Sequence, residues 1–188
     1  GWRGVHALGS LELPHQSWLS CDFLRAVRSL EPDLVIAGNL HGVGDSLDVI
    51  AALKSDGIPT LCYMHDGFWV TGRCAYPMDC ALFKTGCDAS CPTAHESPAL
   101  APEKINAAWR KRAELFAGAD PVPLITNSEW TRQLAVARFG ERARSRVVCL
   151  GLDQELFSPI DQGEARRIVG IQDDRPIVAM GAVNINDA

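Results

Sequence analysis

A histidine and an aspartate stand together directly after a short apolar run. Pro59–Tyr63 have the length and composition of a buried parallel strand, so His65 and Asp66 would lie at its carboxyl end, where open α/β sheets bind ligands. An imidazole exchanges hydrogen bonds near neutral pH, and a carboxylate can orient it or accept a bond from a sugar hydroxyl. The rings of Phe68 and Trp69 suit carbohydrate as well as core packing. The pair is therefore a candidate catalytic site; the structural alternative is a strand-end histidine bonded to a neighbouring backbone group.

Four cysteines follow within a polar loop, residues 74–92, that has neither helical nor strand periodicity. Cys74, Cys80, Cys87 and Cys91 are separated by five, six and three residues. Four thiolates are a common ligand set of structural zinc, and a bound ion would offset the entropy lost in ordering so long a loop. Disulfide bonds and unlinked thiols are the alternatives. A catalytic thiol is not favoured, because no base is identifiable beside any of the four.

A second polar turn comes after another apolar run. Asp33–Ala37 is predicted to be a buried strand, and Asn39, His41 and Gly42 follow it directly. This turn would face the same edge of the sheet as His65. Asn39 and His41 could contact an acceptor or a sugar there. The alternative is a simple strand-to-helix turn in which Asn39 caps backbone groups.

These motifs resemble those of a known family. The family 4 glycosyltransferases that build bacterial exopolysaccharides of the colanic-acid kind carry HD-x-W-x-x-TG-x-C, then three more cysteines and CP. This chain has His65-Asp66, Thr71-Gly72, the four cysteines and Pro92 in the same order. Its tryptophan, Trp69, is shifted by one place, and three residues rather than two separate the last two cysteines.

Three further segments are similar to the same family. Residues 39–42 resemble its N-x-H-G turn, and Ser128 and Trp130 resemble its S-x-W turn. Residues 151–159 resemble its junction NG-I-D-x-x-x-F-x-P, although Leu150 stands where the family has asparagine.

The resemblance implies an α/β fold with a Rossmann-like parallel sheet, the N-terminal, acceptor-binding half of a GT-B glycosyltransferase. Residues 1–158 would form that domain, incomplete at its N-terminus, and residues 159–188 would begin a truncated domain that binds the nucleotide sugar. The implied enzyme is a retaining hexosyltransferase of polysaccharide biosynthesis that acts on a saccharide or lipid-linked acceptor. Without the nucleotide-binding half, the chain alone is expected to be inactive.

The resemblance also assigns roles. His65 and Asp66 would be catalytic, with His65 bonded to the transferring sugar. The substrate-binding residues would be Asn39, His41, Gly42, Thr71, Gly72, Ser128 and Trp130. Transfer requires no cofactor, so any zinc bound by Cys74, Cys80, Cys87 and Cys91 would be structural.

Composition sets outer bounds on function. The 188 residues are 47% hydrophobic and 22% charged, which is typical of a globular chain. A formal net charge of −5 argues against a nucleic-acid partner. The sequence contains no membrane-spanning apolar run and no signal-peptide pattern, so we expect a cytoplasmic location, either in bulk solution or at the inner face of the membrane. The predicted helix Pro102–Ala117 carries the basic residues Lys104, Arg110, Lys111 and Arg112, which would allow a peripheral membrane contact, with a solvated helix face as the alternative.

Alternating strands and helices are predicted along the rest of the chain. Besides the two strands above, strands are expected at Pro123–Thr126, Arg146–Leu150 and Ile177–Met180. Helices are expected from Ser17 or Ser20 to Glu31, from Ser46 to Gly57, over Pro102–Ala117, from Ser128 to Phe139 and over Glu164–Val169.

Two other function classes remain open from the sequence. A metallohydrolase could use His41, His65, Asp66 and nearby thiols as metal ligands. A zinc-binding four-cysteine interaction module would have no enzymatic activity.

Overall fold

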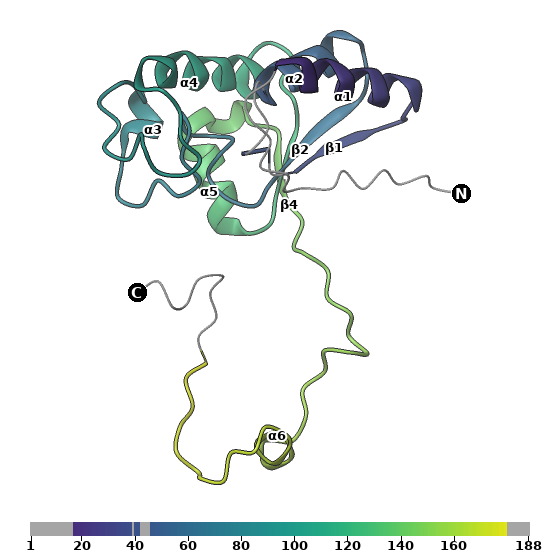
Figure 1. The fold of residues 1–188 in the computed structure, drawn as a ribbon, viewed down its shortest axis with the longest axis vertical. Coiled ribbons are helices and arrows are strands. Elements are labelled where there is room, and N and C mark those ends of the chain that lie inside the picture. Colours follow the sequence, from purple (N-terminus) through teal and green to yellow (C-terminus); the bar gives the residue numbers. More distant parts are fainter. Residues whose placement is uncertain (1–16, 39, 42–45, 180–188) are drawn as a thin grey trace. The chain divides into compact units, whose positions relative to one another are not determined.

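Four parallel strands form a single sheet in sequential order, β1-β2-β3-β4. The computed structural model describes residues 17–38, 40–41 and 46–179 (Figure 1). The strands are β1 Val35–Ala37, β2 Thr60–Met64, β3 Leu124–Thr126 and β4 Ser145–Val147. The chain thus has a mixed α/β architecture with an all-parallel sheet, which is compatible with the predicted Rossmann-like fold.

Helices connect the strands. The helices are α1 Ser17–Ser29, α2 Ser46–Ser55, α3 Leu82–Thr85, α4 Pro102–Ala117, α5 Glu129–Phe139 and α6 Gln162–Ile168, with a 3₁₀ turn η1 at Gly140–Arg142. Helix α2 packs against α1 and α4, and α4 also contacts α5. Figure 1 shows α1, α2 and α4 as a row of helices along the sheet.

One face of the sheet carries the hydrophobic core. Cys62, Met64 and Leu124 are fully buried, whereas Leu61 and Tyr63 on the alternate face of β2 remain partly exposed. Each strand is added on the same side of the one before it, so right-handed connections place all connecting helices on one face of the sheet. In the described part of the chain, the other face has no helix to cover it, which explains why its side chains are more exposed. The prediction that β2 is a buried strand is therefore correct for one face only.

Helix boundaries follow the predicted stop and start signals. Gly57 has a positive φ of 72°, and the following amide, Ile58 N, donates to the Leu53 carbonyl at 3.1 Å, which closes the end of α2. Proline stands at the first position of α4, where its missing N–H costs nothing. The predicted helix Pro102–Ala117 is confirmed residue for residue.

Two predictions differ from the structure. The loop of residues 74–92 contains the short helix α3, because Phe83 is buried and anchors one turn. No strand forms over residues 177–179, the described part of the strand predicted at Ile177–Met180.

The chain divides into two compact units, Gly1–Leu150 and Gly151–Ala188. The first contains the sheet and α1 to α5, and the second contains α6. The predicted domain boundary at residues 158 and 159 lies further along the chain than this division. In the part of the chain that the structure describes, no helix combines the length and apolar character needed to cross a membrane.

Candidate functional site

The carboxyl ends of three neighbouring strands carry the candidate polar residues. His41 follows β1, His65 and Asp66 follow β2, and Asn127 and Ser128 follow β3. Because the strands are parallel and paired in this order, these segments leave the sheet at the same edge. The predicted residues Asn39 and Gly42 lie outside the described residues.

His41 and Asp66 form a direct pair. The distance from His41 Nε2 to Asp66 Oδ2 is 3.1 Å, and Asp66 Oδ1 accepts a second hydrogen bond from the Phe68 amide at 2.8 Å. Only 4% of Asp66 is exposed, whereas the His41 side chain keeps 25% of its surface. A carboxylate only accepts, so Nε2 of His41 is the donor, and Nδ1 is left for another partner. Asp66 thus orients a partly exposed imidazole.

His65 is held by packing and through its backbone. Its ring packs on Tyr63 with a centroid separation of 4.7 Å, and its Nε2 approaches Gly38 from the neighbouring strand end. The His65 carbonyl accepts from the Asn127 side-chain amide at 3.1 Å. Among the described residues, no side chain or backbone group forms a hydrogen bond with the ring nitrogens of His65. Because the ring is partly exposed, it can bond a ligand at the sheet edge.

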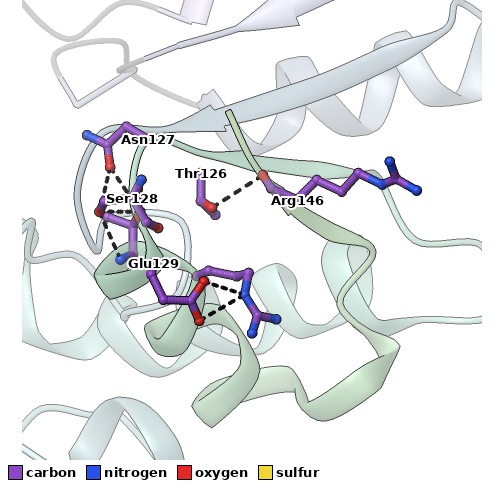
Figure 2. Close-up of polar contacts among 7 residues, drawn as sticks. Thr126, Asn127, Ser128, Glu129 and Arg146 are labelled. Carbon is purple, nitrogen blue, oxygen red and sulfur yellow. Dashed lines mark hydrogen bonds and ion pairs between the residues drawn. The ribbon is translucent and has the colours of Figure 1, made fainter. Parts of the chain in front are cut away.

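Asn127 and Ser128 join β3 to α5 through a set of local bonds (Figure 2). The Ser128 hydroxyl accepts from Thr131 N at 3.3 Å, and Thr131 Oγ1 accepts from Ser128 N at 3.2 Å, a reciprocal helix cap. Asn127 Oδ1 accepts from the Thr131 hydroxyl at 2.9 Å while its amide reaches His65. The predicted helix start at Ser128 is confirmed, whereas the bond from Asn127 to His65 joins two strand ends and was not predicted.

Ser128 and Trp130 therefore differ in accessibility. The Ser128 hydroxyl is already engaged in the cap, and the Trp130 side chain is half exposed on the first turn of α5. Of the two residues predicted to bind substrate here, Trp130 is the one with free surface. Both substrate-binding assignments stay predictions.

Thr71 and Gly72 lie under the cysteine loop. Thr71 is fully buried, and its hydroxyl donates to the Cys74 carbonyl at 2.6 Å. A Cβ at Gly72 would lie 2.6 Å from Cys87 Cβ and from Ile105 Cγ2, so only glycine fits between the loop and α4. These contacts give both residues a packing role, and their predicted role in substrate binding stays a prediction.

An aromatic and a cationic side chain connect this region with the sheet edge. Phe68 lies between the His41 ring, at 4.6 Å between centroids, and the Arg112 guanidinium, at 4.5 Å from its ring centre. Arg112 is 3% exposed, so assigning it to a solvated or membrane-facing side of α4 was wrong. Burial lowers the pKa of Arg112 to about 10, which leaves it charged at neutral pH. Trp69 is also buried, where it packs edge-on against Phe116.

The four cysteines of the loop are free thiols that line one cavity of about 400 Å³. Burial raises the pKa of Cys74, and it raises the pKa of Cys87 to about 11. In the described residues, no three His, Cys, Asp or Glu side chains are close enough together to hold a metal ion as they stand.

The sheet edge thus combines a carboxylate-oriented imidazole with a second imidazole whose ring nitrogens bond to none of the described residues, and a half-exposed tryptophan stands on the first turn of the helix that follows β3. Such groups bind and orient hydroxyl-bearing ligands. Comparisons with protein-family models, curated proteins and solved structures found no match for this chain.

Proposed function

We propose that this chain is the acceptor-binding half of a retaining GT-B glycosyltransferase. The whole enzyme would transfer a hexose from a nucleotide sugar to a saccharide or lipid-linked acceptor in polysaccharide synthesis. The observation that carries the proposal is the arrangement at the sheet edge, where His41, His65 and Asp66 follow adjacent parallel strands, His41 pairs with Asp66, and the His65 ring bonds to none of the described residues. The resemblance of the histidine, threonine-glycine and cysteine motifs to family 4 glycosyltransferases supports the same assignment.

In the proposed transfer reaction the two histidines bind different substrates. His65 donates a hydrogen bond to a hydroxyl of the transferring sugar, and His41 binds an acceptor hydroxyl through Nδ1. Asp66 is a positioning residue, because it is buried and bonded to His41 and to the Phe68 amide. Holding the sugar and the acceptor in register accelerates the reaction by making it effectively unimolecular.

The transfer step breaks the bond between the anomeric carbon and the diphosphate oxygen, and the electron pair stays with the diphosphate. The acceptor oxygen bonds the anomeric carbon on the same face, and its proton passes to the departing diphosphate. Charge on that group would be met by residues of the nucleotide-binding half.

A lipid-linked acceptor would bring the enzyme to a membrane surface, but α4 offers only a modest basic face. Lys104 and Arg110 are exposed, whereas Lys111 pairs with Asp48 of α2 and Arg112 is buried. Two neighbouring acidic residues, Glu103 and Glu114, are exposed as well. A peripheral contact through this helix would therefore be weak and salt-sensitive.

Nothing in the structure favours a metallohydrolase. In the described part of the chain, His41 and Asp66 bond to each other, and no third ligand-type side chain joins them around a common point. A hydrolytic zinc needs at least three protein ligands and an open position for water.

The direct test uses the natural protein that contains these 188 residues. It would be incubated with radiolabelled UDP- and GDP-hexoses and a lipid extract, and labelled glycolipid or saccharide would be quantified. We expect transfer from one of these donors by the natural protein and none by the 188-residue chain alone, because leaving-group stabilisation belongs to the other half.

Two results would contradict the proposal. Transfer by the isolated 188-residue chain would overturn the division into acceptor and donor halves. A natural protein that is folded but neither transfers nor hydrolyses any of these donors would overturn the glycosyltransferase assignment.

A further inference from the structure

The four loop cysteines, which are spread over residues 74–91, all face one cavity. Cys74 follows the buried Thr71-Gly72 turn, Cys80 precedes α3, and Cys87 and Cys91 come after it. All four line the same cavity.

Helix α4 fixes the backbone around these thiols. Asn106, Trp109 and Arg112 recur every three residues along α4, and each donates to a loop carbonyl: Cys87 O at 3.0 Å, Phe83 O at 2.9 Å and Gly72 O at 3.0 Å. Thr71 holds the Cys74 carbonyl from the other side. The backbones of Cys74 and Cys87 are therefore held in place before any ligand arrives, which lowers the entropic cost of a site.

Two buried arginines lie near the thiols and form no ion pair with a carboxylate of the described residues, although Asp79 and Glu96 also line the cavity. Arg73 and Arg112 are each 3% exposed, and both donate only to neutral oxygens: Arg73 to Pro98 O and to the carbonyl and hydroxyl of Thr93, Arg112 to Gly72 O and Ala108 O. None of the ion pairs among the described residues involves either of them. The Nε atom of Arg112 is buried without a partner. Buried charges are costly unless an opposite charge lies near them.

We infer that Cys74, Cys80, Cys87 and Cys91 bind one structural Zn²⁺ ion. The ion displaces four thiol protons, and Zn²⁺ with four thiolates keeps two negative charges, which Arg73 and Arg112 balance. Because no three of these thiols already stand at ligand distance in the described structure, Cys80 and Cys91 have to move toward the held Cys74 and Cys87 when the ion binds. The site goes beyond the proposed sugar transfer, and its test does not depend on that activity.

Zinc content measures the site directly. The 188-residue chain, expressed with zinc in the medium and purified under reducing conditions without chelator, should contain about one zinc per molecule. Cys80→Ser should reduce that content to near zero, whereas Cys149→Ser, an exposed thiol outside the cavity, should leave it unchanged. Zinc should also raise the thermal midpoint of the metal-free wild-type chain but not that of Cys80→Ser.

Measurements on the wild-type chain keep the test decisive if Cys80→Ser fails to fold. A mercurial reagent should release the zinc as four thiols react, and Co²⁺ in place of zinc should give the visible absorption of a tetrahedral thiolate complex. The inference is overturned if the folded wild-type chain contains no zinc and all four thiols react freely. Two disulfides among these cysteines, or iron with sulfide in place of zinc, would overturn it as well.

Discussion

Asp66 connects two parts of the sheet edge at the level of single atoms. One carboxylate oxygen lies 3.1 Å from His41 Nε2, and the other accepts from the Phe68 amide at 2.8 Å. A buried donor that loses its acceptor keeps the full cost of leaving water. The Phe68 N–H is in that position, whereas His41 can still reach solvent.

Asp66→Ala should therefore lower the free energy of unfolding by about 1–3 kcal/mol, the cost of stranding a buried donor. Asp66→Asn should cost at most about 1 kcal/mol, because its amide oxygen can still accept from Phe68 N–H. Urea unfolding of both variants checks this. If both variants lose the same free energy of unfolding, the negative charge of Asp66, rather than its acceptor oxygen for the Phe68 amide, stabilises this turn.

The sequence predicted where the site residues lie in the fold better than it predicted which residues they contact. His41, His65 and Asp66 were expected at strand ends because each follows an apolar run, and the structure places them there. The pairing of His41 with Asp66 joins residues from different strands, so no local pattern reveals it. Arg112 was misassigned because its neighbours on α4 are charged, whereas its burial depends on the loop that packs over the helix.

Among the elements, α5 has the best-defined start. Its N-cap residue, Ser128, has extended backbone and exchanges bonds with Thr131 in a reciprocal cap. Ser128 was also predicted to bind substrate, so a substitution of Ser128 can distinguish a helix-capping role from a substrate-binding role.

Ser128→Ala should reduce the free energy of unfolding by about 1 kcal/mol, the usual value of a helix N-cap. Ser55→Ala, at an exposed position that ends α2, is the matched control and should stay within about 0.5 kcal/mol of wild type. Denaturant midpoints of the two variants give the comparison. An unchanged midpoint for Ser128→Ala, with weaker substrate binding by the natural protein, would instead support the ligand role.

Elements with strong local signals were predictable, and those that depend on tertiary contacts were not. Helix α4 has proline at its start, and the parallel strands β2 and β3 are apolar runs between turn residues. Helix α3 is a single turn that forms around the buried Phe83, and the sequence around it gives no periodicity. The strand expected at Ile177–Met180 has an apolar composition but pairs with no neighbour in its described part, so it does not form there.

In the first unit as a whole, the buried side chain of Arg112 contacts both the segment under the cysteine loop and the sheet edge. Arg112 donates to the carbonyl of Gly72, which lies under the loop, and stacks on Phe68, which in turn packs against the His41 ring. A change in the loop can therefore reach the sheet edge through three side chains in contact. We therefore expect zinc bound at the proposed site to stabilise the position of the His41 ring through Arg112 and Phe68.

The central claim concerns His65, and turnover measured together with the thermal midpoint in the natural protein tests it most directly. If His65 bonds the sugar mainly in the transition state, His65→Ala should lower kcat about 30- to 1,000-fold, or roughly 2–4 kcal/mol, with little change in acceptor binding. The thermal midpoint should hardly move, because the ring makes no internal hydrogen bond among the described residues. His95→Ala, at an exposed position shortly after the cysteine loop, should leave both quantities unchanged. A lower thermal midpoint with near-normal turnover for His65→Ala would contradict the account and leave His65 a structural residue.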